Sequence, residues 1–401
     1  MATERFLFPH HQKIKLKKLC FLLFLFSSFI HSDENIVIVI SLDGIRYDYL
    51  ERTETDAFSY LRKGGASASS LVPVYQSSTF PTHVTMATGV TPDLHGILHN
   101  SFYDKERGSF SYSPDASWIQ FEPVWSILEN QNMKTATYFW VGSETDWRGT
   151  SISYSKAPFN GRIGEKEKLD QILEWLDMEI DLRPRLIMSW WHGTDSVAHQ
   201  KGATHPDVFK QLNKQDKILF QLIEEISLRN IWNKVTLLVV SDHGMSDVSN
   251  FINLKEILKL NSIKARISTG PAVAHIFLEN KEDLKKTISS LRENQHLSVW
   301  SKENLPKEFN MFNETRTGDV IVTTSIPNML VTRNNSNPPI GMHGYNPRDN
   351  KQMHSIFLAY GNKVANKRLQ KVHQLDIAPT ILDLLNLDVP KYMQGRIIDL
   401  Q

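Results

Sequence analysis

The chain has 401 residues, of which 41% are hydrophobic and 22% charged, a balance typical of globular proteins that excludes wholesale disorder. Lysine and arginine number 45 against 44 aspartate and glutamate residues, so the formal net charge is +1. No global attraction to nucleic acid or to an anionic membrane is therefore expected. The length accommodates two or three ordinary domains, or one large α/β domain with insertions.

The first patterned segment is an apolar run at residues 19–30, preceded by Lys13, Lys15, Lys17 and Lys18. A basic stretch, a short apolar stretch and small polar residues after it are typical of a secretory signal peptide. The run is also shorter than the roughly 20 residues that span a bilayer. We therefore predict a signal peptide over residues 1–32 and an exported mature chain without a transmembrane span, with an uncleaved signal anchor as the alternative.

The single cysteine, Cys20, lies inside this run, so cleavage near Ser32 leaves a mature chain without cysteine. Exported eukaryotic proteins of this size more often carry disulfides, which favours a bacterial origin and a periplasmic or secreted location. Under that origin the two N-glycosylation sequons, at Asn313 and Asn334, are chance matches.

Apolar runs and helical patterns alternate along the remaining chain. Continuous apolar runs predict strands buried on both faces, and apolar residues at helical spacing predict helices over Pro206–Leu228 and around 377–385. This alternation predicts an α/β fold with a mostly parallel sheet and helices on both faces. Patterning weakens from about 250 to 337, which we interpret as a smaller inserted cap. The predicted strands cover residues 35–41, 135–140, 186–191 and 235–241.

Acidic segments follow three of these strands. Asp43 follows the first, Asp195 follows the run at 186–191, and Asp242 follows the run at 235–241. Ligand sites in such sheets lie beyond the carboxyl ends of the strands, so these three side chains are expected to share a site. Each aspartate alone is weak evidence for a site, because a single Asp-Gly after a strand is usually part of a turn.

Histidines accompany the three aspartates. His199 lies four residues after Asp195, His243 follows Asp242 directly, and His343 stands between two glycines. Carboxylate and imidazole together suit zinc, and six such ligands divide naturally between two ions. No thiolate is available in the mature chain, so an all-cysteine zinc site is excluded.

Thr79 is the candidate nucleophile. With Pro81 after it, Thr79 is typical of a helix N-cap, and the helix is expected to run through Val84 to Thr88 and end at Gly89. The field of a helix N-terminus favours phosphate and an alkoxide, and coordination to zinc would lower the pKa of the hydroxyl further. A simple N-cap is the alternative interpretation.

Together these motifs resemble the nucleotide pyrophosphatase/phosphodiesterase family of the alkaline phosphatase superfamily. They span residues 37 to 360, and the segments at 92–100 and 138–143 are also similar to the family. The resemblance implies an alkaline-phosphatase-like fold, with the phosphodiesterase catalytic domain at residues 33–401. The motifs are Asp43, Thr79-Phe-Pro-x-His83, Asp195-x3-His199, Asp242-His243-Gly-Met and His343-Gly.

The resemblance also implies roles. Thr79 would form a phospho-enzyme intermediate, and Asn100 would donate its side-chain amide to a phosphoryl oxygen. Two zinc ions are implied as cofactors. One would be held by Asp43, Asp242 and His243, with Thr79 as a further ligand, and the other by Asp195, His199 and His343.

Two aromatic residues near these motifs are candidates for substrate binding. Phe80 follows the nucleophile and Trp190 lies shortly before Asp195, so either is placed to stack on a base, with core packing as the alternative. Many relatives have lysine before the nucleophile, where this chain has Ser78. That departure removes no metal ligand and bears on substrate choice.

The sequence therefore predicts an exported two-zinc phosphodiesterase or nucleotide pyrophosphatase that acts through Thr79 on a small-molecule diester or nucleotide. No stable complex with nucleic acid is expected. A phosphomonoesterase or a phospholipase C-like hydrolase on the same scaffold is the alternative in the same chemistry. A manganese phosphotransferase and a catalytically inactive relative that binds a phosphate ligand also remain open.

Overall fold

The computed structural model describes residue 1 and residues 35–401, so the predicted signal peptide lies outside the described residues. Within this described part, no helix is both long enough and apolar enough to cross a bilayer.

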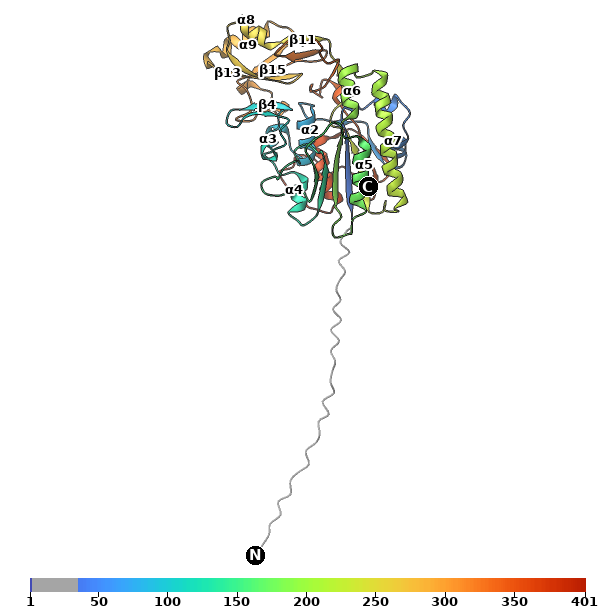
Figure 1. The fold of residues 1–401 in the computed structure, drawn as a ribbon. Coiled ribbons are helices and arrows are strands. Elements are labelled where there is room, and N and C mark those ends of the chain that lie inside the picture. The colour runs from blue at the N-terminus through green and yellow to red at the C-terminus, as the bar shows by residue number, and fades with distance from the viewer. Residues whose placement is uncertain (2–34) are drawn as a thin grey trace. The chain divides into compact units, whose positions relative to one another are not determined.

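An eight-stranded sheet lies at the centre of the molecule, with strand order β19-β2-β18-β9-β1-β8-β6-β7 (Figure 1). Strand β1 (Ile36–Leu42) pairs in parallel with β8 (Leu186–Trp191) and β9 (Val235–Val240). Strand β18 (Phe357–Gly361) pairs antiparallel with β9 and β2. The sheet is completed by β2 (Ala66–Ala68), β6 (Thr135–Tyr138), β7 (Tyr154–Lys156) and β19 (Lys367–Leu369).

Helices cover both faces of this sheet. Every residue of β1 is buried, and its side chains point alternately to the two faces of the sheet. Ile38 belongs to the hydrophobic cluster on one face and Val39 to the cluster on the other. The predicted α/β architecture is thereby confirmed, and the predicted helix over Pro206–Leu228 matches α7. The first cluster includes α1 (Asp56–Gly64), α5 (Glu165–Leu176) and α7 (Pro206–Leu228), and the second includes α2 (Thr79–Thr88), α4 (Val124–Glu129) and α10 (Ile377–Leu384).

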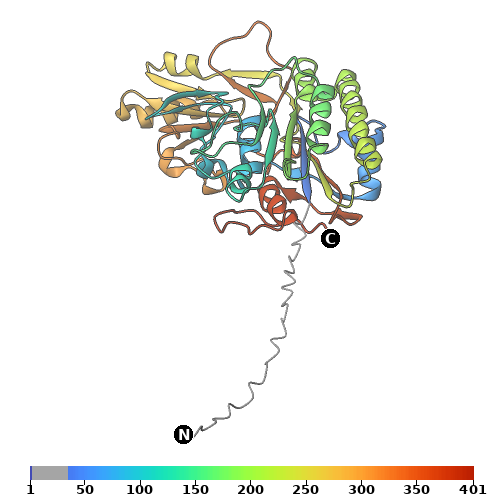
Figure 2. The same cartoon turned by 60° about the horizontal axis from the view of Figure 1, so that its bottom comes forward.

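A second, antiparallel sheet is built from the region of weaker patterning. Its strand order is β12-β13-β15-β14, and its apolar side chains form a hydrophobic cluster of their own with α8 and α9. Figure 2 shows this sheet, in yellow and orange, far from the green helix α7. That it acts as a cap stays a prediction. The elements are α8 (Leu254–Leu260), β12 (Ala265–Thr269), β13 (Val273–Leu278), α9 (Leu284–Arg292), β14 (Ser298–Ser301) and β15 (Val320–Thr323).

Short elements connect the two sheets. Strands β11 and β16 pair in parallel where the chain enters and leaves the second sheet, and β4 with β5 forms a hairpin that contacts β12. The remaining short strands and α-helices, including these, are β3 (Leu71–Val72), α3 (Pro92–His95), β4 (Ser101–Asp104), β5 (Gly108–Ser111), α6 (Gly193–Lys201), β10 (Ser246–Asp247), β11 (Asn250–Asn253), β16 (Asn328–Val331), β17 (Gly341–Met342) and β20 (Val372–His373).

Arg316, just before β15, ties the second sheet to the rest of the molecule. Its Nε donates to Oδ2 of Asp104 at 2.8 Å, and its Nη1 donates to the carbonyl oxygens of Gly96 and Trp118 at 2.6 and 3.0 Å. Both partners of the ion pair are buried, since Arg316 and Asp104 are each only 2% exposed. The Arg316 guanidinium lowers the pKa of Asp104, against the effect of burial.

We expect Arg316→Ala to lower the free energy of unfolding by about 3–5 kcal/mol, because it leaves the Asp104 carboxylate buried without its partner. Urea denaturation measures this change. Arg107→Ala is the control, since Arg107 also packs over Trp118 but its ion pair with Asp115 is exposed. The control variant should lower the free energy of unfolding by no more than about 1 kcal/mol. Equal losses in the two variants would contradict an anchoring role for Arg316.

Candidate active site

The carboxyl ends of the central strands bring the predicted acidic residues together. Asp43 directly follows β1, Asp195 lies in the first turn of α6 after β8, and Asp242 follows β9. Gly44 has φ +73°, and a Cβ there would lie 3.0 Å from the Cα of Asp195. The turn after β1 therefore needs glycine, both for its backbone conformation and for the close approach of α6.

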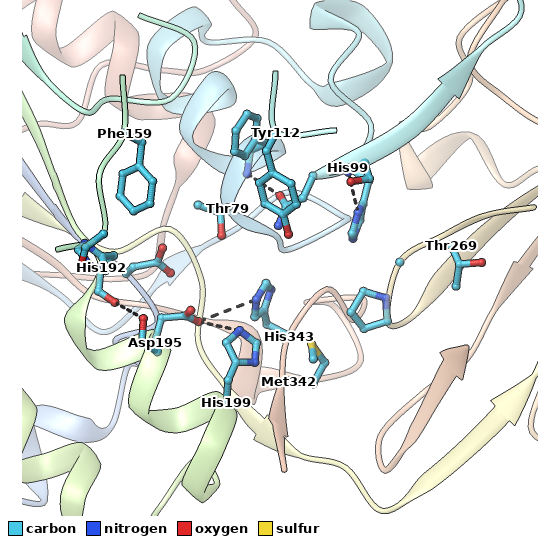
Figure 3. A pocket seen from close by; sticks show the side chains of 18 of the residues that line it. Thr79, His99, Tyr112, Phe159, His192, Asp195, His199, Thr269, Met342 and His343 are labelled. Carbon is cyan, nitrogen blue, oxygen red and sulfur yellow. Dashed lines mark hydrogen bonds and ion pairs between the residues drawn. The ribbon is translucent and has the colours of Figure 1, made fainter. Parts of the chain in front are cut away.

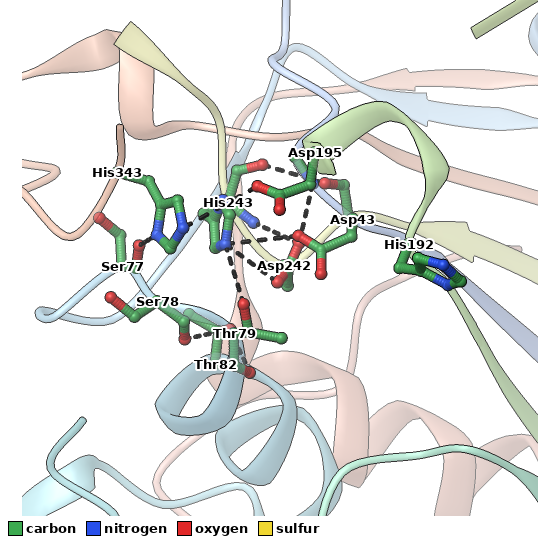
Figure 4. A network of polar contacts seen from close by, with 12 residues as sticks. Asp43, Ser77, Ser78, Thr79, Thr82, His192, Asp195, Asp242, His243 and His343 are labelled. Carbon is green, nitrogen blue, oxygen red and sulfur yellow. Dashed lines mark hydrogen bonds and ion pairs between the residues drawn. The ribbon is translucent and has the colours of Figure 1, made fainter. Parts of the chain in front are cut away.

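The six candidate ligands form two groups, and within each group the ligand atoms lie within 4.8 Å of one another. His199 is one helical turn from Asp195, which places its Nε2 3.3 Å from Oδ1 of Asp195. The two groups adjoin, because the rings of His243 and His343 stack with centroids 3.6 Å apart (Figure 4). One group is Asp43, Asp242 and His243, and the other is Asp195, His199 and His343.

Each aspartate presents a buried oxygen that has no hydrogen-bond partner. These atoms are Oδ1 of Asp43, Oδ1 of Asp195 and Oδ2 of Asp242. The other oxygen is occupied in two of the three, because Oδ2 of Asp43 accepts from Nε1 of Trp190 at 2.9 Å and Oδ1 of Asp242 accepts from the amide of Gly44 at 3.2 Å. Buried carboxylate oxygens without partners are costly, and a bound cation would satisfy them.

The imidazoles are oriented by the backbone. Nδ1 of His199 donates to the carbonyl of Gly341 at 2.8 Å, and Nδ1 of His243 donates to that of Gly244 at 2.9 Å. Nδ1 of His343 likewise donates to the carbonyl of Ser77 at 3.1 Å. Since a carbonyl only accepts, Nδ1 carries a proton in all three rings, and Nε2 is the nitrogen that faces the carboxylates. In a neutral ring this arrangement leaves Nε2 free to bind a metal ion.

The electrostatics of the site also fit a cation. Burial, and then the neighbouring Asp242 and Asp195 carboxylates, raise the pKa of Asp43 well above its ordinary value. Burial and the adjacent His243 lower the pKa of His343 well below its ordinary value. Asp195 and His199 shift the other way, because against the effect of burial each favours the charged form of the other, which lowers the pKa of Asp195 and raises the pKa of His199 to about 9. Carboxylate oxygens and imidazole nitrogens together form a donor set that suits a divalent ion such as zinc.

Thr79 stands at the start of α2, but one position later than expected. Ser78 is the N-cap, with extended backbone angles (φ −133°, ψ 152°), and Thr79 is the first helical residue. The prediction that Thr79 is the N-cap is therefore wrong; its Oγ1 is free of a capping bond and lies 3.4 Å from Nε2 of His243. The helix ends at Thr88, and Gly89 follows with φ +68°, as predicted.

Asn100 lies beside the nucleophile. Its Oδ1 accepts from the backbone amide of Phe80 at 2.9 Å, which directs its Nδ2 group away from that bond. Asn100 is 7% exposed and lines the pocket above Thr79. Its amide is therefore placed as a neutral hydrogen-bond donor for a substrate oxygen.

The pocket over these residues has a volume of about 630 Å³. Figure 3 shows Phe159 and His192 at one end, His99 and Thr269 at the other, and Thr79 between them. Among the described residues that line it there is no lysine or arginine. The phosphate of a substrate would meet the two ligand groups and the neutral amide of Asn100, with no fixed side-chain cation in the wall.

The aromatic lining is larger than the sequence indicated. Phe80 and Trp190 both line the pocket, as do Tyr112 and Phe159, which the sequence analysis missed. Phe159 stacks on Trp190 with centroids 4.7 Å apart, and Tyr112 packs edge-on against Phe80 at 5.4 Å. Tyr112 and Phe159 lie in loops without a recognisable motif, so no sequence signal singles them out.

Trp190 also acts on a candidate ligand, through the indole hydrogen bond to Asp43. We expect Trp190→Phe to weaken metal binding or activity by about 10- to 100-fold, because a smaller aromatic ring remains while the donor to the carboxylate is lost. Titration against a competing chelator measures the affinity. Trp191→Phe is the matched control, since its indole donates to Oγ of Ser189 instead. Equal affinities in the two variants would count against this orienting role.

Comparisons with known proteins agree with this geometry. The chain matches the family described as type I phosphodiesterase/nucleotide pyrophosphatase over residues 37–346. It is 31% identical to an uncharacterized pyrophosphatase/phosphodiesterase of Schizosaccharomyces pombe, over 88% of this chain and 77% of that protein. It is 27% identical to venom phosphodiesterase 2 of Crotalus adamanteus, again over 88% of this chain but only 46% of the venom protein.

Solved structures are similar over most of the chain. Murine ectonucleotide pyrophosphatase/phosphodiesterase 5, in an inactive threonine-to-alanine variant in complex with AMP, has a TM-score of 0.82 and 25% identity and covers 89% of this chain and 96% of its own. These relatives are eukaryotic, so they give no support to the expected bacterial origin. The match over residues 37–346, together with the fold, confirms the resemblance found in the sequence: the chain belongs to the type I phosphodiesterase/nucleotide pyrophosphatase family.

Proposed function

We propose that the chain is an exported, two-zinc phosphodiesterase or nucleotide pyrophosphatase that works through a Thr79 phospho-enzyme. The observation that carries this proposal is the convergence of Thr79, Asn100 and side chains from both ligand groups on one pocket whose described wall has no lysine or arginine. A diester carries one negative charge at phosphorus, and a neutral amide suits it better than it suits a dianionic monoester. The inactive threonine-to-alanine variant of the murine relative, seen with AMP, supports both the nucleophile and a nucleotide substrate.

In the proposed reaction, Oγ1 of Thr79 attacks phosphorus, a Thr79–phosphorus ester forms, and the bond to the leaving oxygen breaks. The proton lost by the Thr79 hydroxyl is balanced by the one that the leaving alcohol takes up. The second ester group of the substrate stays on phosphorus in this intermediate. Water then breaks the Thr79–phosphorus ester, releases the phosphomonoester and restores the hydroxyl. Divalent ions in the two ligand groups would lower the pKa of a bound hydroxyl or water and neutralise phosphoryl oxygens.

The chain's own residues supply position. The amide of Asn100 would hold a non-bridging oxygen, and its bond to the amide of Phe80 keeps that amide directed. Phe80, Tyr112 and Phe159 offer aromatic ring surfaces in the pocket wall on which a nucleoside base would stack, a contact worth about 1–3 kcal/mol per base in other systems. We further propose that residues 250–337 form the inserted cap.

Turnover of bis-p-nitrophenyl phosphate and of p-nitrophenyl phosphate by the zinc-loaded protein tests the proposal. We expect faster release of p-nitrophenol from the diester. Faster turnover of the monoester would instead make the protein a phosphomonoesterase on the same scaffold. A protein that binds AMP but turns over neither substrate would be the inactive, ligand-binding relative.

Export is the other part of the proposal, and it can be tested through the two sequons. Asn334 is exposed, whereas Asn313 is 8% exposed and its Nδ2 donates to the carbonyl of Asp93 and to Oε1 of Gln120. When the full chain is expressed in insect cells, we expect secreted protein with an N-glycan at Asn334 alone. Glycosidase treatment should shift the wild type but not Asn334→Gln. Protein retained inside the cells would contradict the signal peptide.

A further inference from the structure

A second cavity adjoins the pocket on the side away from Phe159. It lies between the β4–β5 hairpin and strand β12 of the second sheet and has a volume of about 330 Å³. Ser101 and Thr269 line both cavities, so the two are neighbours. Thr269 marks the end of the main pocket opposite Phe159 in Figure 3. A substrate that fills the pocket can therefore extend past Thr269 along β12.

The walls of this groove favour a polar ligand. Its described lining contains no aspartate or glutamate, and hydroxyl groups predominate. Oγ1 of Thr269 is buried and has no hydrogen-bond partner. A donor without a partner at the entrance of the groove is suited to a ligand oxygen. The hydroxyl-bearing residues are Ser101, Tyr103, Ser109, Ser111, Ser268, Thr269 and Thr332.

Arg266 is the charged residue in the lining. Its guanidinium lies 4.3 Å from the ring centre of Tyr103, the side chain is exposed, and no carboxylate of residues 35–401 pairs with it. Arg266 is three residues before Thr269 on an extended strand, so their Cα atoms lie about 10 Å apart. By the alternation of a strand, Arg266 shares its face of β12 with Ser268, which also lines the groove. An arginine held against an aromatic face, with its donors unpaired, is well placed to bind phosphate.

We propose that this groove binds the leaving-group side of the substrate and that Arg266 recognises a second phosphate there. Among substrates of the proposed activity, those whose leaving group carries a further phosphate well beyond the scissile one, such as a short oligonucleotide or a dinucleoside polyphosphate, would reach Arg266. This inference rests on the proposed function. The scissile phosphate is held without arginine or lysine, so Arg266 selects substrates by length and leaves the chemical step unchanged.

The test compares three substrates with wild type and Arg266→Gln. The p-nitrophenyl ester of thymidine 5′-phosphate has no charge beyond the scissile phosphate, whereas a trinucleotide and diadenosine tetraphosphate do. We expect kcat/KM to fall about tenfold for one or both extended substrates, through KM, and to stay unchanged for the p-nitrophenyl ester. Whichever extended substrate loses rate identifies the leaving group that the groove accepts. Raising the ionic strength should shrink the difference between the two proteins.

Two variants complete the design. Lys285→Gln, on α9 and outside the groove lining, removes the same charge and should leave all three rates unchanged. Arg266→Lys keeps the charge and should recover part of the loss. Equal effects of Arg266→Gln on all substrates, or none on any, would overturn the inference while an active wild type leaves the proposed function standing. A wild type inactive on all three substrates would overturn both.

Discussion

Thr79→Ala is expected to lower diester turnover by at least about a thousandfold, because it removes the atom that attacks phosphorus. The fold should survive, since the Oγ1 of Thr79 makes a single long contact, at 3.4 Å to His243, whereas its backbone carbonyl holds the first turn of α2 through Nδ1 of His83. Measuring kcat together with the melting temperature separates the two effects.

Ser78→Ala is the control for this variant. Ser78 carries the neighbouring hydroxyl, which lies 3.3 Å from Nε2 of His99 and makes no capping bond, so its loss should change turnover by less than about tenfold. If Thr79→Ala kept its activity and Ser78→Ala lost it, the nucleophile would be Ser78. Wild-type protein quenched during turnover should carry on Thr79 a phosphoryl group that still bears the remaining ester substituent of the substrate, which mass spectrometry detects.

Loss of one ligand from either group is expected to remove about one of two bound ions. We expect this of His343→Ala in one group and of Asp242→Asn in the other, with loss of nearly all activity in each, because each group would supply three protein ligands to its proposed ion. Elemental analysis of the purified variants measures the metal-to-protein ratio. His296→Ala is the control, since this exposed histidine lies in the second sheet region and outside both groups.

Metal removal by a chelator should also lower the melting temperature. A metal ion that binds only the folded state stabilises that state. The bound ion is also expected to neutralise the buried oxygens of Asp43, Asp195 and Asp242 that have no hydrogen-bond partner. Zinc should restore both stability and turnover. An unchanged metal ratio in His343→Ala and Asp242→Asn would refute the division into two groups.

The large sheet was predictable because each central strand is a continuous apolar run buried on both faces. The run at 235–241 became β9, and the helix over Pro206–Leu228 was found with its bounds, since its apolar stripe is long. The second sheet was not predicted as strands. Its strands are four to six residues long, and β12 alternates only weakly between buried and exposed positions.

The candidate site could be predicted only where the residue type itself indicates metal binding or nucleophilic attack. Asp, His and Thr at strand and helix ends carried that signal, so the groups around Asp43 and His343 were expected. Phe159 and Arg266 carry no such signal, because their place in the walls depends on how loops and the second sheet pack. The error at Ser78 has a similar cause: several hydroxyl residues in a row can each serve as an N-cap.

The backbone carbonyls of Ser77, Gly244 and Gly341 aim the three histidine rings, and this has a consequence for transplanting the site. The orientation of each ring is set by a hydrogen bond to the main chain and does not depend on a neighbouring side chain. A designed scaffold that copied only the six ligand side chains would leave its imidazoles free to rotate. The smallest portable unit is therefore the set of loops that carries those carbonyls.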